Sequence, residues 1–291
     1  MAGLLSSTFD SNVVAVRSHW RGYATLKHLV VFGASYCDVG YDYRSPHPTL
    51  ENPLGVEFPG YTWAEPGKAN WVGHLITEHA LSPMLVYDYA LGGDRVDGVR
   101  RQIERGFIPH LAPRPHWAPW TEQDTLFATW VGINDCSYET PETIPGVVSD
   151  LFKLQAKLYE HGARNFMFVD LPPIERSPSG PSPERAARMF ADKLPRTALW
   201  NTTLRTQAAA FAASHGDATV LIYSSWHLFT KVLDDPTTFG FGKDDVRRPA
   251  SSIWVDRLHP TSNMHDVVAH DMAQFLGSIS APVTGGERIA R

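Results

Sequence analysis

The stretch VVFGASYCDVG, residues 30–40, decides the fold, because it is an apolar run that ends abruptly at Gly33-Ala34-Ser35. A continuous apolar run without polar alternation is typical of a strand buried on both faces of a parallel sheet. Glycine followed by small residues indicates a sharp turn at the strand end. Ser35 is therefore either a nucleophile presented at that end or a polar residue where a strand stops.

Four further apolar runs alternate with segments of helical period: MLVYDYALGG (84–93), TLFATWVGIND (125–135), NFMFVDLPP (165–173) and ATVLIYSS (218–225). Parallel strands need crossover connections, which are usually helices. We therefore predict an α/β fold: a three-layer α/β/α sandwich around a five-stranded parallel sheet of flavodoxin-like order. Residues 28–279 would form one domain, 1–27 an N-terminal extension and 280–291 a flexible tail.

Composition excludes several functional classes. The 291 residues carry a formal net charge of −5, which gives no electrostatic reason to bind nucleic acid or an anionic membrane. We expect a soluble monomer without a membrane anchor, since no run approaches 18 apolar residues. Asp10, Arg17 and Arg21 interrupt any signal-peptide core, so we expect a cytoplasmic protein, or a secreted one if the N-terminus is incomplete.

Four segments that are distant in sequence are predicted to meet at the carboxyl edge of the sheet, where ligands bind in such folds. They are Ser35 after the first strand, LGGD (91–94), GIND (132–135) and DRLHP (256–260). Ester hydrolysis needs a nucleophile, a base, a group that orients the base, and donors for the oxyanion. These roles fall to Ser35, His259, Asp256 and, for the oxyanion, the backbone N–H groups of Ser35 and Gly93 with the side-chain amide of Asn134.

Each of these residues has an ordinary structural interpretation when taken alone. A serine at a strand end is usually a turn or cap residue, and a single histidine near a helix start is usually structural. The placement of all four segments in one order favours the catalytic interpretation. Tyr61, Trp63 and Trp71 are candidate substrate contacts, and Trp117 and Trp120 could also stack on a sugar, although loop aromatics more often anchor packing.

We predict no metal and no organic cofactor. His74, His79, His265 and His270 lie in helical stretches without a His-Glu-x-x-His signature, so no catalytic metal is expected. The two cysteines, Cys37 and Cys136, are expected to be free thiols. A disulfide between them is the less favoured alternative.

The blocks VFGAS, ALGGD, GIND and DRLHP together resemble the SGNH, or GDSL, hydrolase superfamily, whose Ser, Gly, Asn and His would be Ser35, Gly93, Asn134 and His259. The segments NPLGVEFPGYTW and WVDRLHPTSNMH are similar to fungal acetylesterases of carbohydrate esterase family 16. The resemblance implies a serine esterase that acts on acetyl esters of a sugar or small molecule without a cofactor. One departure is Ala34, which replaces the aspartate that the family usually has beside its nucleophile; another is the missing export signal.

Three other functions stay open at this stage. An α/β-hydrolase also has Ser, Asp and His in this order, but its nucleophile elbow would need glycine where Cys37 lies. A catalytically weak or inactive carbohydrate- or metabolite-binding homologue could have lost the carboxylate beside Ser35. A lipase or thioesterase would act on longer acyl chains.

Overall fold

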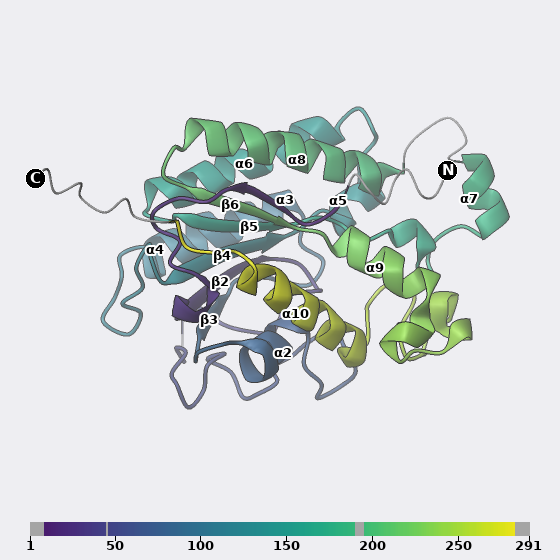
Figure 1. Cartoon of the computed structure of the whole chain (residues 1–291), viewed down its shortest axis with the longest axis horizontal. Coiled ribbons are helices and arrows are strands. Elements are labelled where there is room, and N and C mark those ends of the chain that lie inside the picture. The colour runs from purple at the N-terminus through teal and green to yellow at the C-terminus, as the bar shows by residue number, and fades with distance from the viewer. Residues whose placement is uncertain (1–8, 45, 190–194, 283–291) are drawn as a thin grey trace, which may run out of the picture.

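Six strands form the central sheet: β1 (Asn12–Ala15), β2 (His28–Gly33), β3 (Leu85–Asp88), β4 (Thr125–Trp130), β5 (Asn165–Val169) and β6 (Thr219–Tyr223). Their order across the sheet is β1-β6-β5-β4-β2-β3 (Figure 1). The structure is a computed structural model and describes residues 9–44, 46–189 and 195–282. Strands β2 to β6 are parallel and have the flavodoxin-like order that the sequence predicts.

The prediction of five strands was wrong by one, because β1 pairs antiparallel with the outer edge of β6. Only the last of its four residues is buried, so this strand lacks the continuous buried run that marks the other strands. Residues 12–15 fall in the segment assigned to an N-terminal extension, and they instead complete the sheet. Within the predicted tail, residues from 283 onward lie outside the described ranges, as do residues 1–8 of the predicted extension.

Helices cover both faces of the sheet and give the predicted three layers (Figure 1). One face carries α3 (Val96–Arg101), α6 (Ile144–Glu160) and α8 (Arg196–Ser214). The other face carries α2 (Trp71–His74), its π-helical continuation η2 (Leu75–His79) and α10 (Ser262–Gly277). The helix α9 (Ser225–Asp234) lies beside α10. Shorter elements connect them: η1 (Tyr23–Thr25), η3 (Gln102–Phe107), α4 (Ile108–His110), α5 (Ile133–Tyr138), η4 (Ile174–Arg176), α7 (Pro183–Met189), η5 (Pro236–Phe239) and η6 (Lys243–Arg247). In the described ranges, no helix has the length and apolar character needed to span a membrane.

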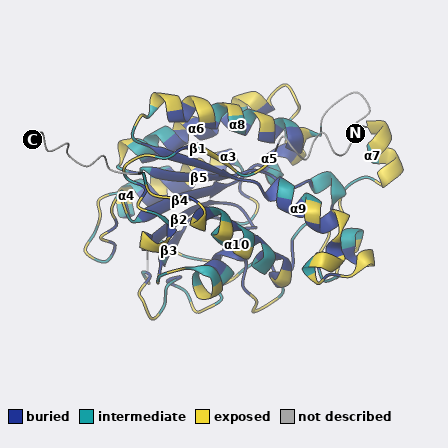
Figure 2. Cartoon of the chain, viewed as in Figure 1, coloured by how far each residue is buried: buried dark blue, intermediate teal, exposed yellow. Residues whose placement is uncertain are grey.

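The core explains why the strand runs are apolar throughout. Every residue of β2, β4, β5 and β6 is buried, and Figure 2 shows the strands dark blue between the two helix layers. A parallel sheet covered on both faces has no polar side, so its strands read as continuous hydrophobic segments. The same arrangement leaves the carboxyl edge of the strands as the place where polar residues gather.

The chain reverses its direction of winding between β2 and β4. From β2 it moves to β3 on one side, and then crosses to β4 on the other side. Gly33, at the end of β2, pairs in register with Trp130, at the end of β4. In doubly wound sheets a crevice opens at such a switch point. The segments that contain Ser35 and Asn134 therefore leave the sheet side by side.

The segment before β2 belongs to the same folded body as the sheet. Trp20 is fully buried, and its indole N–H donates a hydrogen bond of 3.0 Å to the carbonyl of Ile279, just beyond α10. The backbone N–H of Arg17 donates to the Thr219 hydroxyl, at the start of β6. These contacts join the N-terminal segment to the end of the last helix and to the start of β6.

We predict that Trp20→Ala lowers the free energy of unfolding by about 3–5 kcal/mol, because it removes a fully buried indole and leaves a cavity. Trp20→Phe should cost less, since it retains most of the ring but loses the hydrogen bond to Ile279. Urea unfolding followed by circular dichroism measures both changes. Leu50→Ala, at an exposed leucine, serves as the control; a Trp20→Ala midpoint equal to that of this control would contradict the prediction.

Candidate active site

Ser35 lies in a tight turn that begins immediately after β2. A side chain at Gly33 would place its Cβ 2.4 Å from the carbonyl oxygen of Trp130, so only glycine fits here. The carbonyl of Ala34 accepts hydrogen bonds from the backbone N–H groups of Cys37 at 2.9 Å and Asp38 at 3.1 Å. The turn fixes the backbone at Ser35, whose residue surface is only 7% exposed.

His259 and Asp256 lie in the loop that precedes α10. His259 Nε2 is 3.0 Å from Ser35 Oγ, and His259 Nδ1 is 2.7 Å from Asp256 Oδ2. Asp256 Oδ1 accepts two backbone N–H groups, from Leu258 and His259, at 2.7 Å each. Tyr36 connects this loop to the serine turn, because its hydroxyl donates to the carbonyl of Leu258 at 2.7 Å. The structure therefore brings together the three predicted triad residues from two distant segments.

The electrostatics of Asp256 suit the role of orienting the imidazole. Partial burial opposes its ionisation, but hydrogen bonds from the His259 ring and from the amides of His259 and Leu258 outweigh this effect and lower the pKa of Asp256. An ionised Asp256 accepts the proton-bearing Nδ1 of His259, which leaves Nε2 free to accept the hydroxyl proton of Ser35. The arrangement can generate a serine nucleophile.

Two of the three residues predicted to stabilise an oxyanion, Gly93 and Asn134, lie next to each other. Gly93 has a positive φ of 82°, and no atom lies within 4 Å of where a Cβ would be, so this position is open. Asn134 donates from Nδ2 to the carbonyl of Asp94 at 2.9 Å, which fixes the orientation of its amide and leaves the second N–H available. Asn134 and the Gly93 loop are therefore held together.

Gln102, which the sequence analysis did not single out, ties this loop to the end of β2. Its side chain exchanges two hydrogen bonds with the backbone of Gly33, and it also donates to Asp94 Oδ2 at 2.8 Å. Gln102 is buried, with 7% of its surface exposed. Nothing in the local sequence marks it, because it lies in a helix that reaches the site only through the fold.

Asp135 holds α5, the helix in which Asn134 also lies. Its Oδ1 accepts the N–H of Val96, the first residue of α3, at 3.1 Å. Burial raises the pKa of Asp135 to about 6. This carboxyl therefore fixes α5 against α3 rather than entering the reaction directly.

Asp38 is a second residue that the sequence analysis missed. Its Oδ2 accepts the backbone N–H of Gly92 at 2.8 Å and the indole N–H of Trp63 at 3.3 Å, while Oδ1 accepts the N–H of Gly40. Trp63 in turn stacks on the His259 ring, with ring centroids 4.9 Å apart. Asp38 therefore links the serine turn, the Gly93 loop and the aromatic wall beside the histidine. An aspartate three residues after the serine is the signal that could have revealed it.

The predicted substrate contacts divide into two groups. Tyr61 is 71% exposed and Trp63 is 38% exposed, so both offer aromatic surface to solvent. Trp71 is fully buried and packs near Trp130, so its prediction as a substrate contact was wrong. The sequence pattern could not distinguish the exposed Tyr61 and Trp63 from the buried Trp71, because all three aromatics occur near one another in sequence. Of the two further tryptophans that could have stacked on a sugar, Trp120 is also fully buried and Trp117 stacks on His47.

Cys37 and Cys136 are both buried and both free. Burial raises the pKa of each thiol well above its usual value. A protonated, buried thiol is a poor nucleophile. Cys37 and Cys136 therefore act as small packing residues around the site.

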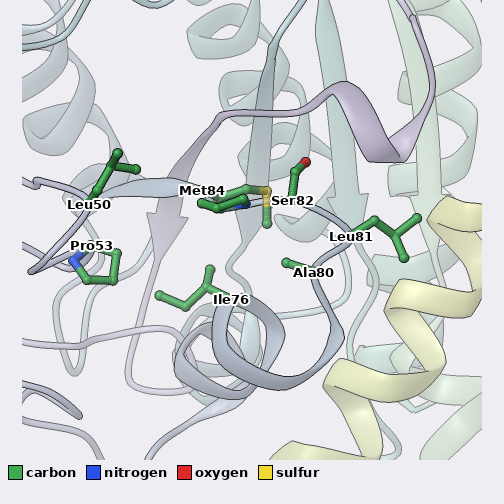
Figure 3. Close-up of a pocket in the computed structure, with 8 residues that line it drawn as sticks. Leu50, Pro53, Ile76, Ala80, Leu81, Ser82 and Met84 are labelled. Atoms are coloured by element: carbon green, nitrogen blue, oxygen red, sulfur yellow. The ribbon is translucent and has the colours of Figure 1, made fainter.

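Two cavities lie outside the triad. One, of about 350 Å³, opens before β3 and is drawn in Figure 3; its lining consists of Leu50, Pro53, Ile76, Ala80, Leu81, Ser82, Pro83 and Met84. Because these residues precede the strand, this cavity lies at the end of the sheet opposite the triad. The other, of about 360 Å³, is lined by Glu175, Arg176, Pro183, Ala186, Leu233, Val246 and Arg247.

The second cavity adjoins the loop that carries Asp256. The backbone N–H of Ser179 donates to the carbonyl of Arg257 at 2.9 Å, and the Arg257 guanidinium donates to the carbonyl of Pro178. On the cavity side of this segment, Arg247 donates to the carbonyls of Glu175 and Pro181. The segment PPIERSPSGPSP, residues 172–183, thus contributes Glu175, Arg176 and Pro183 to the lining of this cavity and contacts the Asp256 loop through Pro178 and Ser179.

The chain is similar in sequence to known acylhydrolases. The chain matches the family model for GDSL-like lipases and acylhydrolases over residues 29–272. It is 30% identical over 277 residues to an acetylesterase of Thermothelomyces thermophilus, across 85% of this chain and 87% of that protein.

Solved structures share the fold. An acetylxylan esterase of Geobacillus stearothermophilus has a TM-score of 0.51 at 15% identity, covering 89% of this chain and 96% of that one. A protein of Parabacteroides merdae provisionally described as a GDSL-like lipase has a TM-score of 0.54 at 14% identity, covering 90% and 98%. At these identities the likeness concerns the α/β architecture only.

We predict that Asp256→Asn lowers kcat for ester hydrolysis by about 10²- to 10⁴-fold with little change in KM, because the amide no longer favours the Nδ1-protonated form of His259. The fall should lie below the top of that range, since the Asp256 side chain is 52% exposed and water can partly replace it. Steady-state kinetics on a chromogenic acetate measures the change. Asp244→Asn, at an exposed aspartate, is the matched control; equal kcat in the two variants would remove Asp256 from the triad.

Proposed function

This chain belongs to the GDSL-like lipase/acylhydrolase family and is a carboxylic ester hydrolase, and we propose that it hydrolyses acetyl esters of a sugar or small metabolite with Ser35 as the nucleophile. The observation that carries the proposal is the hydrogen-bonded series Ser35–His259–Asp256 at the carboxyl edge of the sheet. It combines a hydroxyl, a base and an orienting carboxylate in the geometry that acyl transfer requires.

The first half of the reaction forms an acyl-enzyme. Ser35 Oγ attacks the ester carbonyl carbon while His259 Nε2 takes the hydroxyl proton. The negative charge that develops on the carbonyl oxygen is stabilised by the N–H groups of Ser35, Gly93 and the Asn134 side chain. Each well-placed donor of this kind contributes about 3–4 kcal/mol to the transition state. The C–O bond to the alcohol then breaks, and the alcohol leaves with the proton from His259.

The second half releases the acid. Water takes the place of the alcohol, His259 Nε2 accepts its proton, and the oxygen attacks the acetyl carbon bound to Ser35. The same donors stabilise the second tetrahedral intermediate. Collapse of this intermediate returns the proton to Ser35 Oγ and frees acetate. Asp256 stays ionised throughout and stabilises the imidazolium that forms in both halves.

Two features support a small polar substrate. The exposed rings of Tyr61 and Trp63 offer surfaces on which a sugar ring can stack. The acetylesterase that shares 30% of its sequence with this chain points to the same acyl group.

The experiment that tests the proposal compares wild-type and Ser35→Ala protein on p-nitrophenyl acetate and on acetylated xylo-oligosaccharides. We expect wild-type turnover and a loss of about 10⁴-fold or more in Ser35→Ala, because the nucleophile is removed. Ser214→Ala, at an exposed serine, controls for the substitution itself. Wild-type turnover no faster than Ser35→Ala would favour a binding homologue without catalysis.

A series of p-nitrophenyl esters separates the acetylesterase from the long-chain alternative. We expect kcat/KM to be highest for acetate and to fall as the acyl chain lengthens from acetate through butyrate to octanoate. A maximum at octanoate would favour the lipase or thioesterase function instead.

Ala34 leads to a separate prediction, because the carboxylate usual beside the nucleophile is absent here. In this chain the Gly93 loop is held by Asp38 and Gln102. We expect Ala34→Asp to leave kcat unchanged or to raise it, with Ala34→Asn as the control of equal shape without charge. Loss of turnover in a folded Ala34→Asp protein would show that the site is built around alanine.

A further inference from the structure

A cluster of imidazoles and carboxylates lies outside the triad, where η2 packs against α10. His74 Nδ1, a carboxylate oxygen of Glu78 and one of Asp266 all lie within 4.8 Å of one another. The Asp266 oxygen that is 3.9 Å from His74 Nδ1 is also 2.7 Å from His79 Nε2. His74, Glu78 and Asp266 therefore each offer a ligand atom at one place, and His79 lies beside Asp266 as a further donor.

The π-helical turn explains why His74 and His79 share a face. In an α-helix, side chains five residues apart point about 140° away from each other. The wider turn of η2, Leu75–His79, has i→i+5 hydrogen bonding and brings positions 74 and 79 onto the side that faces α10. A search for helical His-x-x-x-His spacing misses this pair. The absence of that signature led the sequence analysis to expect no metal.

The imidazole of His74 is held from its other side. His74 Nε2 is 2.9 Å from the hydroxyl of Ser262, a buried residue in the first turn of α10. Metal-ligating histidines usually hydrogen-bond through the nitrogen that does not bind the metal, and this contact fixes the ring orientation. The side chains of His74 and His79 are 15% and 17% exposed, whereas those of Glu78 and Asp266 are 50% and 41% exposed. The site is thus anchored on its inner side and open to solvent on its outer side.

We propose that this cluster binds a divalent transition metal ion, with His74 Nδ1, Glu78 and Asp266 as ligands and His79 Nε2 as the fourth donor. Zinc lies about 2.0–2.2 Å from nitrogen and oxygen ligands, so its donors must be roughly 3–4 Å apart. The 3.9 Å between His74 Nδ1 and Asp266 meets this condition. The pairs His74–Glu78 and His79–Asp266 are each 2.7 Å apart as direct contacts and must open by roughly 1 Å to admit the ion, which rotation of the half-exposed carboxylates allows. Imidazole donors favour Zn²⁺ over Mg²⁺ or Ca²⁺.

The bound ion would join η2 to α10 by coordinate bonds. Asp266 lies one helical turn after Ser262, and Ser262 follows the catalytic-loop residue His259 by three positions. The ion would therefore stabilise the packing of the helix that starts directly after the loop of His259. In the described part of the chain the four donors make no hydrogen bond to Ser35, His259 or Asp256, so we assign the ion a structural role.

Isothermal titration of Zn²⁺ into tag-free, chelator-treated protein tests the proposal. We expect one Zn²⁺ per chain, and a loss of affinity greater than about tenfold in His74→Ala and in Asp266→Asn, because each removes a ligand. Glu78→Gln, at a half-exposed position, provides a variant that keeps the packing if the others fail to fold. His161→Ala, at an exposed histidine elsewhere, should bind as wild type does.

The same proteins give a second readout, because an ion that binds only the folded chain raises the melting temperature. Zn²⁺ should raise Tm in wild type and His161→Ala but not in Asp266→Asn. Ser35→Ala should keep both the binding and the Tm shift, which separates this inference from the catalytic proposal. A wild-type chain that takes up no Zn²⁺, or His74→Ala and Glu78→Gln proteins that bind it as wild type does, would overturn the proposal.

Discussion

The close approach of β2 and β4 at Gly33 is the constraint on which the candidate site depends. A Cβ at this position would meet the Trp130 carbonyl at 2.4 Å, so the two strand ends can lie side by side only because residue 33 is glycine. That contact lies at the switch point of the sheet, from which the Ser35 and Asn134 segments both emerge. Parallel strands buried on both faces form a rigid sheet. The polar residues at the strand ends are therefore held in fixed positions relative to one another.

The strand runs and the site segments could be read from the sequence because each depends on local pattern. Buried parallel strands have uninterrupted apolar runs, such as LVVFG (29–33) in β2, and Ser35, Gly93, Asn134 and His259 follow strand ends or precede a helix. β1 could not be identified in this way, because an edge strand with three of four residues at least partly exposed has no such run. Trp71 and Trp63 could not be told apart either, since burial depends on how the loop folds back.

The residues that hold the site together were the least predictable. Gln102 lies in a helix 69 residues after Gly33, and Asp38 connects a glycine and a tryptophan from two other segments. Hydrogen bonds between such distant residues have no spacing that a single sequence can show. His74 and His79 are a further case, since a π-helical turn changes which residues face the same way.

β1 has a consequence for the solubility of the chain. Without it, β6 would form the edge of the sheet, and all five of its residues are buried and apolar or β-branched. An exposed edge of this kind offers unpaired backbone N–H and C=O groups to another chain and is a template for intermolecular strand pairing. The four residues of β1, three of them at least partly exposed, thus cover this edge, and shortened versions of this protein that begin at β2 would expose an aggregation-prone edge.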